Sequence, residues 1–165
     1  MYKKEDEMAK SKRKNNRALR VLKYCAILFA IVGIIMAAFS FVNYGDSSFT
    51  GFQVIFGYTA TTGSIVSVST KVLSFSIIAL LTILLPLIGS LSVICKNKII
   101  RLLGALLMIA GTVMCFFVPN FVVFANDSTK TAYSLFSANL GVGAIIAGIL
   151  FGLGSLCNLF AVVEK

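Results

Sequence analysis

Four long apolar runs constrain this chain more than any other feature of its sequence. They cover residues 24–42, 72–94, 99–118 and 140–163, and they contain no Asp, Glu or His. Arg101, near the start of the third run, is counted with the basic turn that precedes it. A helix needs roughly 20 residues to cross about 30 Å of hydrocarbon. The runs therefore predict four transmembrane helices.

The composition supports this interpretation. Of the 165 residues, 58% are hydrophobic and only 13% are charged, whereas soluble domains carry about 25% charged residues. A soluble domain of this size buries only about 70% of its unfolded surface, so it lacks room for so many apolar side chains. We expect an all-α membrane protein, built as a four-transmembrane-helix bundle.

Lys and Arg residues gather on one side of the predicted topology. Residues 1–23 hold nine of the 15 in the chain. Four more on that side are Lys96, Lys98, Arg101 and Lys165. The other side carries only Lys71 and Lys130. Because positive loops stay in the cytoplasm, we expect both termini there, with the protein in the plasma membrane.

The domain organisation follows from this topology. Residues 1–23 form a basic cytoplasmic tail, and residues 24–165 form a single transmembrane domain. Residues 43–71 and 119–139 are its outer loops. The net charge of +9 predicts attraction of the tail, mainly residues 10–20, to anionic lipid headgroups. We expect no nucleic-acid partner, because most of the charge lies beside a membrane entry point.

The first outer loop is the predicted surface for a protein partner. Aromatic side chains crowd its first part, namely Phe49, Phe52, Phe56 and Tyr58. Residues 64–70 then alternate between apolar and polar types. Two such β-prone segments, joined by residues 59–63, predict a short β-hairpin. The alternative is an irregular loop whose aromatic residues form a belt at the membrane interface.

Small residues recur at helical spacing in two of the runs. One face of the first run carries Ala26, Ala30, Gly33 and Ala37. The fourth run repeats the pattern with Ala144, Gly148 and Gly152. Such faces let helices approach closely in lipid, so we expect helix-packing interfaces here, the tightest on the fourth run. The contact is either within the bundle or with a second protein, which includes another copy of the chain.

Two further residues stand out inside the runs. Pro86 removes a helical hydrogen bond and predicts a kink, which serves as a hinge or as a static packing feature. Asn158 is the only carboxamide in any run. An interhelical hydrogen bond accounts for it, and it is the leading intramembrane polar candidate for a site.

Residues that carry out catalysis are missing from the predicted spans. The chain has no His, and its six carboxylates all lie in tails or loops. We therefore expect no catalytic residues, no metal site and no cofactor. The function predicted is contact with other proteins, as an accessory subunit, scaffold or immunity-type protein. The alternative is an oligomeric channel or facilitator for a small solute.

The predicted order of spans and loops resembles the claudin and peripheral-myelin-protein tetraspan architecture. That resemblance implies a four-span fold and assigns no residue a role, since residues 43–71 lack the Trp and the paired Cys of claudins. Residues 50–57, of sequence TGFQVIFG, are similar to loops in uncharacterised four-span proteins of Gram-positive bacteria. This second similarity implies a bacterial plasma membrane.

Overall fold

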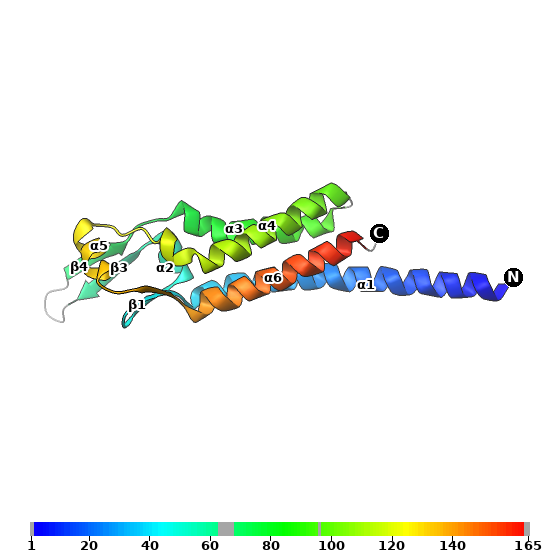
Figure 1. The fold of residues 1–165 in the computed structure, drawn as a ribbon, viewed down its shortest axis with the longest axis horizontal. Coiled ribbons are helices and arrows are strands. Elements are labelled where there is room, and N and C mark those ends of the chain that lie inside the picture. The colour runs from blue at the N-terminus through cyan, green and yellow to red at the C-terminus, as the bar shows by residue number, and fades with distance from the viewer. Residues whose placement is uncertain (1, 63–67, 96, 164–165) are drawn as a thin grey trace.

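The computed structural model describes residues 2–62, 68–95 and 97–163. Within them, four long helices run antiparallel to their neighbours in an elongated bundle (Figure 1). They are α1 (Tyr2–Ile35), α3 (Ile77–Leu91), α4 (Lys98–Phe116) and α6 (Val142–Val163). The strands gather at one end of the bundle, here called the sheet end. Both termini lie at the other, the basic end.

The prediction of four helices able to cross a membrane is confirmed. The segments of sufficient length and hydropathy are Leu19–Ala38, Ile77–Ile94, Lys98–Phe116 and Val142–Val163. Large apolar side chains remain exposed along their outer faces, including Leu28, Leu103 and Ile149. Such a surface suits lipid rather than water. The arrangement is compatible with a tetraspan topology.

The predicted spans extend too far at the sheet end. Helix α1 continues only as a short 3-10 helix, η1 (Met36–Ala38), and strand β1 (Ser40–Tyr44) follows it. Residues 40–42 of the first predicted span are therefore strand, and the second helix begins at Ile77, not at residue 72. The cause is burial within the protein: Phe41 and Val42 are apolar because they fill the core of the sheet end.

A three-stranded sheet joins the two outer loops. Strand β1 pairs antiparallel with β2 (Ser47–Thr50) on one side and with β5 (Ala138–Leu140) on the other. β5 comes from the second loop, directly before α6. The same loop contributes η3 (Val118–Phe121) and α5 (Asp127–Ser134). The description all-α is thus too narrow, because the sheet end is a mixed α and β structure.

The predicted hairpin exists at a different position in the chain. β3 (Tyr58–Thr62) pairs antiparallel with β4 (Val68–Leu73), so residues 59–62, predicted as the connection, are strand. Gly63 and residues 64–67 lie outside the described residues. The predicted first strand is instead helix α2 (Gly51–Phe56), which begins with a capping box between Thr50 and Gln53. That box satisfies two helical N–H groups and favours helix over strand.

The four bundle helices do not pack equally. Helix α6 lies between α1 and α4 and contacts both extensively, and α4 also packs extensively on α3. Helix α1 touches α3 and the short helix η2 (Ser92–Ile94) only lightly. The α1–α3 side is therefore the least tightly closed of the four sides of the bundle.

Candidate functional site

Asn158 occupies the interior of the bundle near the basic end. Its side chain is fully buried, and its Nδ2 donates to the carbonyl of Gly89 on α3 over 3.4 Å. Its Oδ1 has no hydrogen-bond partner within the described part of the chain. Asn158 thus forms one long interhelical hydrogen bond from α6 to α3.

Arg101 is a functional candidate that sequence reasoning missed. Counting it with the polar turn was wrong, because only 2% of its surface is exposed. Its Nε donates to the Cys95 carbonyl over 2.7 Å, and its Nη1 donates to the Ala161 carbonyl over 3.2 Å. One guanidinium therefore ties the α3–α4 turn to the end of α6. The available signal was its position as the only charged residue inside a predicted span.

Two glycines bring α3 and α4 into backbone contact beside these polar groups. A β-carbon added at Gly89 would lie 2.5 Å from the Gly104 carbonyl oxygen and 2.7 Å from Met108 Cγ. A β-carbon at Gly104 would collide with the Ser92 hydroxyl, which donates to the Gly89 carbonyl over 2.6 Å. Gly89, Gly104, Arg101 and Asn158 together form what we call the polar junction of α3, α4 and α6.

The small-residue faces predicted from sequence pack within this single chain. Ala26, Ala30, Gly33 and Ala37 are buried, and so are Ala144 and Gly148. A β-carbon at Gly33 would collide with the Phe151 ring on α6. Gly152, by contrast, is half-buried, and a β-carbon there would have its nearest neighbour 3.7 Å away. These contacts favour the intramolecular alternative for the buried members.

Pro86 is buried within α3, which the described backbone carries through as one helix. Its ring fits against Gly111 of α4, where a β-carbon would collide with it. This contact favours the static packing role over a hinge.

Replacing Asn158 with leucine is expected to change stability little. The long hydrogen bond lost contributes about 0.6 kcal/mol in membrane proteins. Removing the unpartnered Oδ1 also removes its desolvation cost. Thermal unfolding in mild detergent should therefore shift by no more than about 3 °C. A loss above 10 °C would show that Asn158 holds the junction together.

The sheet end has an aromatic core that draws on both outer loops. Tyr44 meets Phe49, Phe124 and Tyr133 edge to face, with ring centroids 5.6 to 6.3 Å apart. Tyr58 packs on Phe49 at 6.0 Å. Burial raises the pKa of the Tyr44 hydroxyl. Phe49 and Tyr58, two of the four predicted partner-loop residues, therefore help to fill this core.

The other two predicted partner-loop residues are exposed. Phe52 and Phe56 stack on each other on the outer side of α2, with ring centroids 6.5 Å apart. Phe39, Phe75 and Phe117 are also exposed, each beside the sheet-end terminus of a bundle helix. Aromatic rings gather at this level in membrane proteins, where bilayer meets water. We call these five residues the aromatic belt.

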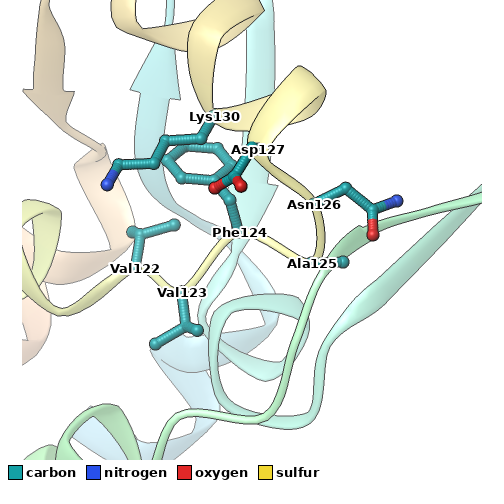
Figure 2. A pocket seen from close by; sticks show the side chains of 7 residues that line it. All are labelled: Val122, Val123, Phe124, Ala125, Asn126, Asp127 and Lys130. Atoms are coloured by element: carbon teal, nitrogen blue, oxygen red, sulfur yellow. The ribbon is translucent and has the colours of Figure 1, made fainter.

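An open hollow of about 500 Å³ lies where η3 leads into α5 (Figure 2). Its charged lining groups are Asp127 and Lys130. Figure 2 shows the Asn126 amide and the Lys130 amine extending to opposite sides of the hollow. The lining thus lacks the convergent polar groups that typify a small-molecule site.

Metal-binding clusters are not found in the part of the chain that the structure describes, where no three His, Cys, Asp or Glu side chains come together. No protein-family model, curated protein or solved structure matches this chain.

Proposed function

We propose that this chain is a non-enzymatic multi-pass membrane protein that works by binding another protein at its sheet end. Both termini would lie in the cytoplasm, and the membrane would be the plasma membrane. All six carboxylates lie outside the four apolar segments, and the sequence has no His. General acid–base catalysis within the bundle would lack its usual side chains.

The observation that carries this proposal is a folded head with an exposed apolar pair. The head consists of β1 to β5, α2, η3 and α5, closed around the aromatic core. Leu135 and Phe136, between α5 and β5, expose 81% and 53% of their surfaces. They lie outside the four apolar segments, so lipid does not account for them. Exposed apolar side chains on a folded surface favour a protein contact.

The aromatic belt has a different role in this proposal. Phe52 and Phe56 lie on α2, which packs against η1 and the start of α3. They would anchor the head at the bilayer surface, which is the interfacial alternative for the first loop. The partner would then contact the water-facing pair Leu135 and Phe136.

The double substitution Leu135→Ser with Phe136→Ser is expected to remove the partner. Wild-type protein, purified from the native membrane in mild detergent, should carry a second protein in stoichiometric amount, identified by mass spectrometry. Truncating a buried aromatic contact costs about 2 kcal/mol, so recovery of the partner should fall by about thirty-fold. The thermal unfolding temperature should stay unchanged, because both side chains are exposed.

The matched control is Phe52→Ser with Phe56→Ser, which also removes two exposed apolar side chains. It should keep the partner at the wild-type level. A wild-type preparation that contains only copies of this chain would contradict the proposal and favour the channel alternative, to be tested by solute flux in liposomes. Loss of the partner in the control alone would place the contact at the belt, against the proposal.

A further inference from the structure

A second hollow lies at the basic end, on the loosely closed side of the bundle. It has a volume of about 250 Å³ and opens between α1 and η2, so we call it the α1–η2 cleft. Its lining residues are Arg20, Lys23, Tyr24, Ile27, Val93 and Ile94. The light contact of α1 with α3 and η2 leaves this cleft between them.

The lining of the cleft is graded from charged to apolar along α1. Arg20 and Lys23 are three residues apart, so their side chains lie on the same face of the helix. Tyr24 comes next, and Ile27 lies one turn further toward the sheet end. The apolar segment of α1 begins at Leu19, so the two cations sit within its first turns. This is the depth of lipid phosphates, with acyl chains beginning below.

The opposite wall of the cleft is apolar. Val93 is fully buried, whereas Ile94 exposes 63% of its surface toward the surroundings of the bundle. An occupant thus needs a negative group at one end and a hydrocarbon chain at the other. Inorganic phosphate has only the first, and a lipid without net charge gains little from two cations.

We propose that the α1–η2 cleft binds one anionic phospholipid, with its phosphate beside Arg20 and Lys23 and its acyl chain along Ile27 and Ile94. The inference rests on the proposed membrane insertion and is independent of the partner contact at the head. It replaces a diffuse attraction of the tail with a defined site on the folded bundle.

The test is native mass spectrometry of the full chain in mild detergent with added phosphatidylglycerol or phosphatidylcholine. Wild-type protein should retain one phosphatidylglycerol in preference to phosphatidylcholine. Arg20→Gln with Lys23→Gln should weaken phosphatidylglycerol binding by about thirty-fold, since each cation near an anionic surface contributes about 1 kcal/mol. Ile94→Trp, which keeps the charge and fills the apolar wall, should weaken it by about tenfold.

The matched control is Arg17→Gln with Lys98→Gln. Both residues are exposed at the basic end and lie outside the cleft, so phosphatidylglycerol binding should stay within about threefold of wild type. Equal loss in this control, equal retention of both lipids by wild type, or displacement of phosphatidylglycerol by excess inorganic phosphate would each overturn the proposal. Carbonate extraction of native membranes tests insertion separately, so failure of insertion is distinguishable from failure of the site.

Discussion

Replacing Arg101 with alanine is expected to destabilise the bundle more than removal of any other single side chain at the basic end. The guanidinium donates to the Cys95 and Ala161 carbonyls from a fully buried position. Each such bond from a charged donor is worth about 1.5 kcal/mol or more, and the truncation also leaves a cavity. We expect a loss of about 4 kcal/mol, or roughly 10 °C or more in thermal unfolding followed by circular dichroism in detergent.

Lys98→Ala is the matched control, because Lys98 is one turn away on α4 and exposed. It should unfold within about 2 °C of wild type. Arg101→Lys should recover only part of the stability, since one compact ammonium lacks the fork that reaches two carbonyls. An Arg101→Ala protein as stable as the Lys98→Ala protein would contradict the role assigned to the guanidinium.

Gly89→Ala is expected to separate α3 from α4 by adding a single carbon atom. That atom would lie 2.5 Å from the Gly104 carbonyl oxygen and 3.1 Å from the Met108 amide nitrogen, and both are backbone atoms. Overpacking a closed core costs about 1 to 3 kcal/mol even where side chains adjust. We expect about 3 kcal/mol, measured as a fall of roughly 10 °C in thermal unfolding.

Gly152→Ala makes the same chemical change where there is room for it. The nearest atom to the added carbon would be Thr112 Cγ2 at 3.7 Å, an ordinary van der Waals contact. This variant should be as stable as wild type, because alanine favours helix over glycine. If Gly152→Ala proved the more damaging of the two, the closest helix contact would be on α6, as the sequence pattern predicts.

The number of membrane-length helices was predictable, because hydropathy over about 20 residues depends only on composition. The ends of the helices were not, since Phe41 and Leu73 are as apolar as lipid-facing residues but fill the head core. Spacing identified the face that contains Ala26 and Gly33, both buried against the rest of the bundle. It missed Gly89 and Gly104, which belong to different helices and meet only once α3 and α4 are packed.

The polar junction and the hairpin show two further limits. Arg101 follows a polar turn closely, so a charge count assigns it to water, whereas tertiary contacts bury it. In the first loop, aromatic residues alone suggested strand for residues 51–56, but the capping residues Thr50 and Gln53 make that segment helical. Local hydrogen bonding decided the outcome there.

The pairing of β1 with β5 makes the head mechanically continuous with two helices. β1 follows α1 after η1, β5 precedes α6, and the Gly141 N–H donates to the Phe41 carbonyl over 2.8 Å where strand gives way to helix. A β-carbon at Gly141 would collide with the Ser40 backbone, so the two chains are in contact at this point. A pull on the head is therefore shared between α1 and α6 through backbone hydrogen bonds, and the pair carries it as one rod to the basic end.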